Sequence, residues 1–271
     1  MKRVRQIQLS GLLLALTAVA IWLRDPLWMM APADTLPLAL GLPLTYFLGY
    51  PWHSAKNSAP RSLHLLAVGG GIALGVGWVI GSLTLLAASW TLLAMIWAHW
   101  SFARQARRGR LFWLLLLSFP WLVVDWPVIG WVFRLSSATV AEQVFKLLEL
   151  PAQRDGTHLV IMSVPVEIEA SCAGWNLLQL ALLSGVAFGT YEIRSASRFT
   201  ILLCLIPAIA WLANLLRILI LSGIALSYDA QVASGAIHGL TGLVVLGAVL
   251  AMTKGLCRLL DPPPAISSRI V

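Results

Sequence analysis

The sequence predicts an all-α fold, a polytopic integral membrane helical bundle of about eight transmembrane helices. Only 11% of the 271 residues are charged and 59% are hydrophobic, whereas a soluble domain carries about a quarter charged residues. Apolar segments of roughly 17–25 residues, the length needed to span a bilayer, recur along most of the chain. The net charge of +8 comes from basic residues in short loops between these segments. The positive-inside rule explains that pattern without a nucleic-acid partner.

The first four spans follow one another closely. We expect an uncleaved first helix at residues 9–23, because further apolar segments follow too soon for a signal peptide. The second span, 35–50, contains prolines, which membrane helices tolerate when neighbours satisfy the freed backbone groups. Spans at 63–81 and 82–100 are closely joined, and "GGGIALGVG" in the third supplies small residues for tight helix packing.

A fifth span at 111–126 precedes the longest polar region, 134–170. Within that region, "SSATVAEQVFKLLEL" is amphipathic, which predicts a helix lying on the membrane with Val140, Val144, Leu147 and Leu148 on its apolar face. "HLVIMSVPVEIEA" alternates polar and apolar residues, which favours a short hairpin or extended segment. The remaining spans are expected at 175–191, 199–222 and 232–254.

Lysine and arginine counts set the orientation. With eight spans, all five groups of basic residues fall on one side, which predicts that both termini are cytoplasmic. The segment 134–170 carries more acid than base and is placed outside the cell, before the sixth span.

Three residues far apart in sequence are predicted to lie at one depth. Cys172 sits at the outer start of span six, Arg217 about one and a half turns from the outer end of span seven, and His238 a similar distance inside span eight. At about 1.5 Å per residue, all three lie within roughly 10 Å of the outer boundary. They therefore occupy one leaflet on consecutive spans.

These residue types suit acyl transfer through a thioester. A nearby cation lowers the pKa of a thiol, a histidine can move the proton, and an arginine can hold an oxyanion. Each also has a structural alternative: Cys172 as a small apolar packing residue, His238 as an interhelical hydrogen-bonding group, and Arg217 as a side chain that extends to the interface. The shared depth favours chemistry over these alternatives.

Two further residues are candidates for supporting roles. Asn214 lies one turn before Arg217 and could hydrogen-bond its guanidinium, although simple helix packing is an equal alternative. Glu169 could orient a base or meet a substrate, with a solvated acid as the alternative. The histidines outside this group lack ligand spacing, so we expect no metal and no cofactor.

Around these residues the sequence resembles the exosortase/archaeosortase family. The resemblance lies in three motifs in order, "EASCAGWN", "NLLRI" and "HGLTG", and covers roughly residues 164–254. Ala173 stands where serine is commoner after the cysteine, and histidine at the third motif favours a bacterial exosortase-like member. Because the sequence shows no internal repeat and no second domain, we expect one membrane-embedded domain over 1–260, with its catalytic region at 164–254 and a short disordered cytoplasmic tail at 261–271.

The resemblance also implies an activity. Family members cut secreted envelope proteins near a C-terminal sorting motif (Pro-Glu-Pro in the best-known group) that precedes a membrane helix and a basic tail. They are thought to pass the new C-terminus to an envelope acceptor. It implies Cys172 as the nucleophile, Arg217 as the transition-state stabiliser and His238 as the acid/base, facing outward from the inner membrane. One alternative is a small membrane transporter that uses Arg217 and His238 as a substrate or proton site. A second is a membrane acyltransferase or intramembrane protease that uses the same cysteine on a different substrate.

Overall fold

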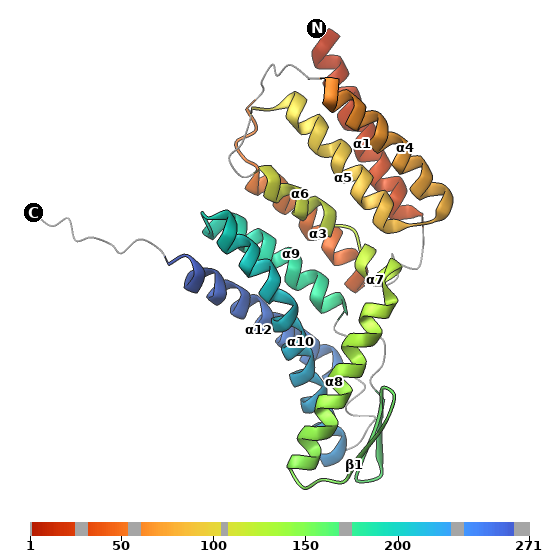
Figure 1. Cartoon of the computed structure of the whole chain (residues 1–271), viewed down its shortest axis with the longest axis vertical. Helices are drawn as coiled ribbons and strands as arrows, with labels where there is room; N and C mark the ends of the chain where they lie inside the picture. Colours follow the sequence, from red (N-terminus) through yellow and green to blue (C-terminus); the bar gives the residue numbers. More distant parts are fainter. Residues whose placement is uncertain are drawn as a thin grey trace, which may run out of the picture. The chain divides into compact units, whose positions relative to one another are not determined.

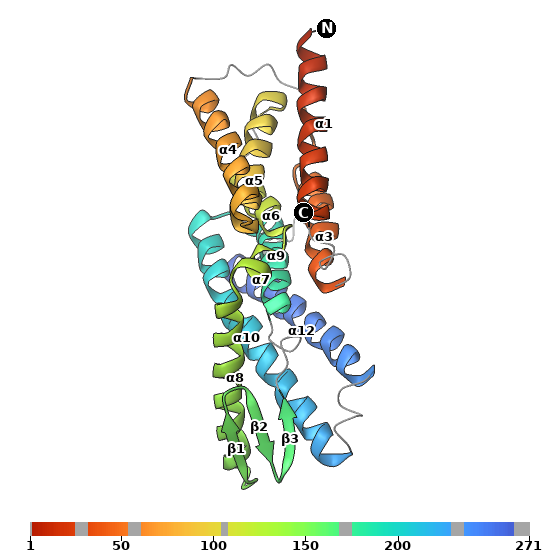
Figure 2. The ribbon, with the colours of Figure 1, turned by 90° about the vertical axis from the view of Figure 1, so that its right-hand side faces the viewer.

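The computed structural model describes residues 2–24, 32–53, 61–103, 108–167, 175–228 and 236–262. The chain divides into two compact units, residues 1–127 and 128–271; Figure 1 labels the helices and β1, and Figure 2 labels all three strands. The first unit contains α1 (Lys2–Leu23), α3 (Pro32–Leu48), α4 (Arg61–Ile80), α5 (Leu83–Ser101), α6 (Arg108–Leu117) and α7 (Trp121–Asp125). From Pro127 onward the elements are α8 (Pro127–Leu147), β1 (Ala152–Asp155), β2 (His158–Ile161), β3 (Val164–Glu167), α9 (Trp175–Glu192), α10 (Ala196–Ser227) and α12 (Ala236–Leu260).

The helices agree with a polytopic membrane protein. Within the described residues, five helices are long and apolar enough to cross a bilayer, and these lie in α1, α4, α5, α10 and α12. The other expected spans correspond to the shorter apolar helix α3, to α6 with α7, and to the 18-residue α9. Five helices thus meet the length and composition criterion, so the predicted count of eight stays a prediction.

The close joining of the third and fourth spans is confirmed. Gly81 (φ +78°) makes the turn, and the hydroxyl of Ser82 caps α5 by accepting from the Leu85 N–H at 3.2 Å. Gly70 and Gly77 of α4 are buried, and a Cβ on either would lie 3.1 Å from an atom of α5. Two of the small residues therefore let α4 and α5 approach closely.

The fifth span is broken rather than continuous. Helix α6 ends at Leu117, and α7 starts at Trp121 with Pro120 as its N-cap residue. Proline removes a backbone donor and disfavours helical geometry in the residue before it. Asp125 at the end of α7 accepts hydrogen bonds from the Ser82 hydroxyl (2.8 Å) and the Thr84 N–H (2.6 Å), which tie α7 to the start of α5.

The second unit is built around α9, α10 and α12, which pack against one another and lie side by side in Figure 1. Gly185 of α9 lies against the side chains of both Ile206 (α10) and Thr253 (α12), so these three residues share one level of the bundle. Toward the C-terminal end of α12, Asp261 accepts hydrogen bonds from the Arg194 N–H (2.7 Å) and from Arg198 Nη1 (2.9 Å). We call this the Asp261 end.

The predicted hairpin is confirmed and enlarged to a three-stranded antiparallel sheet in the order β1-β2-β3. Gly156 (φ +59°) lies in the turn between β1 and β2, and Met162 (φ +50°) with Ser163 (φ +70°) makes the turn between β2 and β3. Positive φ angles at both central residues match the right-handed strand twist in a two-residue hairpin loop. Strand β3 contacts α10, and Figure 2 shows the sheet beside α8 and α10.

The amphipathic segment adopts a different arrangement from the predicted surface helix. It belongs to α8, which begins at Pro127 and buries Ala138, Ala141 and Phe145 in one cluster with residues of α10 and the sheet. Val140 of the predicted apolar face packs against this cluster, whereas Leu147 and Leu148 are 84% and 61% exposed, so only the end of that face is free to meet a membrane. Small alanines let the helix pack against protein along a face that hydropathy alone does not reveal.

Candidate functional site

Arg217 extends its guanidinium from α10 onto the backbone of α12. A Cβ added to Gly242 would lie 3.4 Å from Arg217 Nη2 and 3.7 Å from Cζ. Glycine therefore leaves the space in which the guanidinium lies. His238 precedes Gly242 by four residues, about one helical turn, so the structure brings the Arg217 guanidinium within about one turn of the His238 backbone position.

The start of α9 lies at the same level. Trp175, the first residue of α9, lies ten residues from Gly185 in the direction away from the Asp261 end. At about 1.5 Å per residue this is roughly 15 Å. Ten residues from Ile206 along α10 lead to the neighbour of Arg217, and ten residues back from Thr253 along α12 lead to the neighbour of Gly242. Since Arg217 contacts Gly242, the alignment of the three helices is supported independently. We call this level the Arg217 end. Cys172 and Glu169 lie outside the described residues, in the segment 168–174 that joins β3 to α9.

Two helix ends differ from the prediction. Helix α10 continues to Ser227, so Arg217 lies almost three turns from its end rather than one and a half. Helix α12 begins at Ala236, which places the backbone of His238 in its first turn. The terminal residues of α10, "IALS", carry no proline or charge that would end the helix earlier.

Asn214 does not form the predicted hydrogen bond to Arg217. Its side chain is completely buried, and among the described residues neither its amide oxygen nor its amide nitrogen has a partner. The Ser222 hydroxyl, two turns further along α10, is likewise buried without a partner in the described part of the chain. Burying an amide or hydroxyl without a hydrogen bond costs about 1–3 kcal/mol.

Helix α8 adds two polar groups that the sequence analysis missed. Ser137 is completely buried, and neither its hydroxyl nor Nε of Arg134 has a hydrogen-bond partner among the described residues. Both lie on the stripe of α8 that continues into buried Ala138 and Ala141, facing the unit interior. A hydrogen bond of 3.0 Å from Trp211 Nε1 to Ser136 ties α8 to α10 nearby. The sequence analysis places Arg134 at the start of the polar region 134–170, and the signal that could have found it is its i, i+4 spacing from Ala138.

An ionic cluster fixes the sheet to α8. Glu142 accepts hydrogen bonds from Lys146 Nζ (2.7 Å) and Arg154 Nε (3.3 Å), and Arg154 Nη1 donates to the Gly156 carbonyl (2.9 Å). The hydrogen bond from Lys146, with the Arg154 charge, holds the pKa of Glu142 below its usual range despite partial desolvation. The sheet that leads into the Cys172 segment is thus anchored to the helix that carries Arg134.

Two cysteines are described, and neither lies near Arg217. Cys204 is exposed on α10 at the Gly185 side of the bundle, and Cys257 is completely buried near the end of α12. Within the described residues, no group of three or more His, Cys, Asp or Glu side chains could hold a metal ion.

A family model for the transmembrane exosortases matches residues 4–255, almost the whole chain. Comparisons with curated proteins and with solved structures returned no match. The match extends well beyond the three motifs of the second unit and includes the helices of the first. The chain therefore belongs to the transmembrane exosortase family.

Proposed function

We propose that this protein is a membrane-embedded cysteine peptidase/transpeptidase that cleaves C-terminal sorting signals of secreted envelope proteins. Cys172 is the nucleophile, His238 the general acid/base and Arg217 the group that stabilises the oxyanion. The observation that carries the proposal is the position of the Arg217 guanidinium against Gly242, one turn from His238 and level with the start of α9.

Chain length supports the inclusion of Cys172. Consecutive Cα atoms are 3.8 Å apart, so Cys172, three residues before Trp175, cannot be further than about 11 Å from the first residue of α9. Trp175 is itself level with Arg217 on the neighbouring helix. A cation and an imidazole near a thiol favour the thiolate.

The reaction needs two acyl transfers. The thiolate attacks the scissile carbonyl, the Arg217 guanidinium holds the developing oxyanion, and the imidazolium of His238 gives its proton to the leaving amine as the C–N bond breaks. The resulting thioester is then attacked by an acceptor nucleophile or water, whose proton His238 takes. The thiolate leaves, and the site returns to its starting state.

The length of α10 supports an extracytoplasmic site. Its 32 residues span about 48 Å, longer than the roughly 30 Å hydrocarbon layer. If the Asp261 end, with Arg194 and Arg198, lies on the cytoplasmic side of the inner membrane, about twenty residues of α10 bring the chain to Arg217 at the outer boundary. There a substrate would present the bond that follows its folded secreted part, with its basic tail inside.

The buried polar groups around this level suit a peptide substrate. Asn214 and Ser137 offer donors and acceptors that lack partners within the described residues, and an extended peptide presents both kinds of group along its backbone. Arg134 could meet a carboxylate of the sorting motif. Substrate binding would then satisfy groups that are costly in the free protein.

The test compares the C-terminal peptides of envelope proteins, by mass spectrometry, in cells carrying the wild type, Cys172→Ala or Cys204→Ala. We expect a defined set of proteins to retain its C-terminal helix and basic tail only with Cys172→Ala. The mature masses distinguish hydrolysis from transfer to an acceptor. Identical termini in all three strains, with each variant present in the membrane at wild-type level, would rule the proposal out. The transporter alternative gains no support from the family match.

A further inference from the structure

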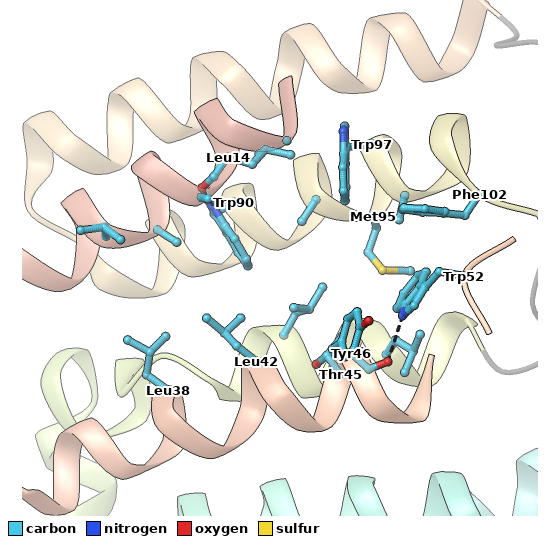
Figure 3. Close-up of a pocket in the computed structure, with 18 of the residues that line it drawn as sticks. Leu14, Leu38, Leu42, Thr45, Tyr46, Trp52, Trp90, Met95, Trp97 and Phe102 are labelled. Carbon is cyan, nitrogen blue, oxygen red and sulfur yellow. Dashed lines mark hydrogen bonds between the residues drawn. The ribbon is translucent and has the colours of Figure 1, made fainter. Parts of the chain in front are cut away.

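The first unit contains a large cavity that the proposed chemistry does not use. Its volume is about 770 Å³, within the ~300–1,000 Å³ range of ligand sites. Figure 3 shows it between two helix pairs, α1 with α5 on one side and α3 with α6 on the other. Each pair is closely packed: Trp97 of α5 covers Gly11 of α1, and Ser118 after α6 touches Gly41 of α3.

The walls of the cavity consist almost entirely of apolar side chains, among them Leu14, Leu38, Leu42 and Met95. Within a bilayer, the abundant material that suits such walls is hydrocarbon.

One end of the cavity has the features of a membrane interface. Tyr46, Tyr50, Trp52, Trp97 and Phe102 gather there, and four of these are labelled together in Figure 3. Trp52 Nε1 donates to the Tyr46 carbonyl (2.9 Å) and Trp97 Nε1 to the Ile7 carbonyl (3.0 Å), which fixes both rings. Amphipathic rings of this kind sit at the headgroup level of a bilayer.

Basic residues flank that same end. Arg5 precedes Ile7, the acceptor of the Trp97 indole, by two residues and is exposed, while Arg110 directly precedes Leu111 of the cavity wall. Basic pockets between membrane helices on the cytoplasmic side attract anionic headgroups. A cavity with an apolar interior and a basic, aromatic end suits an amphipathic ligand with a negatively charged headgroup.

We propose that the cavity binds one anionic phospholipid of the cytoplasmic leaflet, with an acyl chain between the two helix pairs and its headgroup beside Arg5 and Arg110. The chain would complete the packing between α1–α5 and α3–α6. The lipid is a stable constituent of the first unit and is independent of the acyl transfer proposed for the second.

The test is native mass spectrometry of the full-length protein reconstituted in nanodiscs of phosphatidylcholine with a minor fraction of phosphatidylglycerol. We expect the wild type to retain one phosphatidylglycerol after the bulk lipid is removed. Ala15→Phe, which fills the cavity from α1, should retain at least fivefold less. Ala20→Phe adds the same ring to α1 at a position that does not line the cavity and should match the wild type.

Two further measurements keep the test decisive if Ala15→Phe folds poorly. Arg5→Gln should lower the preference for phosphatidylglycerol over phosphatidylcholine severalfold while a lipid is still retained. Wild-type tryptophan fluorescence should be quenched more strongly by brominated-chain phosphatidylglycerol than by brominated-chain phosphatidylcholine at equal bromine content. Equal quenching with no retained lipid, or retention of a peptide mass in place of a lipid, would overturn the proposal.

Discussion

At its Asp261 end the α9–α10–α12 bundle brings charged side chains of opposite sign together, whereas at its Arg217 end it sets a guanidinium against the backbone of Gly242. Asp261 holds Arg198 at 2.9 Å, and Lys254 lies 4.0 Å from Glu192. Buried polar atoms without a partner among the described residues occur toward both ends: Glu192 Oε2 and the Thr253 hydroxyl lie on the Asp261 side. At the other end Asn214 and Ser222 have no hydrogen-bond partner among the described residues.

Glycine also serves a different purpose at each end. Near the Asp261 end, Gly189 makes room for apolar side chains, because a Cβ there would lie 2.7 Å from Leu202. At the Arg217 end, Gly242 makes room for a guanidinium. The same three helices thus use glycine to pack apolar side chains at one end and to accommodate a charged group at the other.

The largest expected effect comes from removing the guanidinium. Arg217→Gln should lower the cleavage rate about 10²–10³-fold, the usual loss for one oxyanion donor, with little change in the amount of folded protein. The measurement is the rate of sorting-signal cleavage in membranes from cells that express each variant. Arg198→Gln removes an arginine of the same helix at the Asp261 end and should cleave at nearly the wild-type rate. Equal losses in both variants would erase the functional difference between the two ends.

Side chains of increasing size at position 242 test whether the space beside the Arg217 guanidinium is needed for cleavage. A Cβ at 3.4 Å from the guanidinium is an ordinary contact, so Gly242→Ala should change the cleavage rate only a few-fold. Gly242→Leu must displace Arg217 and should lower the rate tenfold or more. Gly247→Leu is the matched control, because a Cβ added there would have no atom of another helix within 4 Å. Were Gly242→Leu and Gly247→Leu equally active, the Arg217–Gly242 contact would have no role in catalysis.

Replacement of Asn214 should move stability and activity in opposite directions. Asn214→Leu removes a buried amide that has no partner in the described structure and should raise the free energy of unfolding by about 1–2 kcal/mol. If the amide binds substrate, the same variant should raise KM severalfold. Denaturation in detergent gives the first quantity and cleavage kinetics the second. A loss of stability without a change in KM would show that Asn214 is a structural residue.

The smallest expected effect lies at the Asp261 end and depends on pH. The hydrogen bond from the Arg194 N–H, with the charge of Arg198, holds the pKa of Asp261 below its usual 3.8. Because this pKa is lowered by folding, the stabilisation is fully present above pH 4 and is lost as the pH falls through the folded-state value. Asp261→Asn should melt at a slightly lower temperature than the wild type at pH 7, and the difference should shrink in acid, while the cleavage rate at pH 7 is unchanged.

Much of the fold could be predicted because local chemistry determines it. The Gly81–Ser82 turn, the hairpin and the start of α9 at Trp175 all follow from short-range patterns. The position of α8 could not be predicted in this way, because its buried face consists largely of small residues such as Ser137, Ala138 and Ala141, whose weak hydrophobicity does not mark a buried face in the sequence. The break before α7 depends on Pro120, a residue that membrane helices also tolerate.

The candidate site could be predicted in part. The depth argument brought Arg217 and His238 to neighbouring helices, and the register places Gly242 of the same motif under the guanidinium. Arg134 and Ser137 belong to no sequence motif, so the sequence analysis missed them. Their burial becomes visible only when α8 packs along α10. Asn214 was predicted as a support for Arg217, yet its amide remains unpaired in the described structure.

The central claim, that the Arg217 end carries out thioester chemistry through Cys172, is tested most directly by trapping the acyl group. Membranes containing the protein and a sorting-signal substrate are incubated with hydroxylamine, which attacks thioesters and leaves a C-terminal hydroxamate on the cut protein. The account predicts hydroxamate product with the wild type and with Cys204→Ala, and none with Cys172→Ala. Free acid as the sole product in the wild type, or hydroxamate that persists with Cys172→Ala, would contradict it.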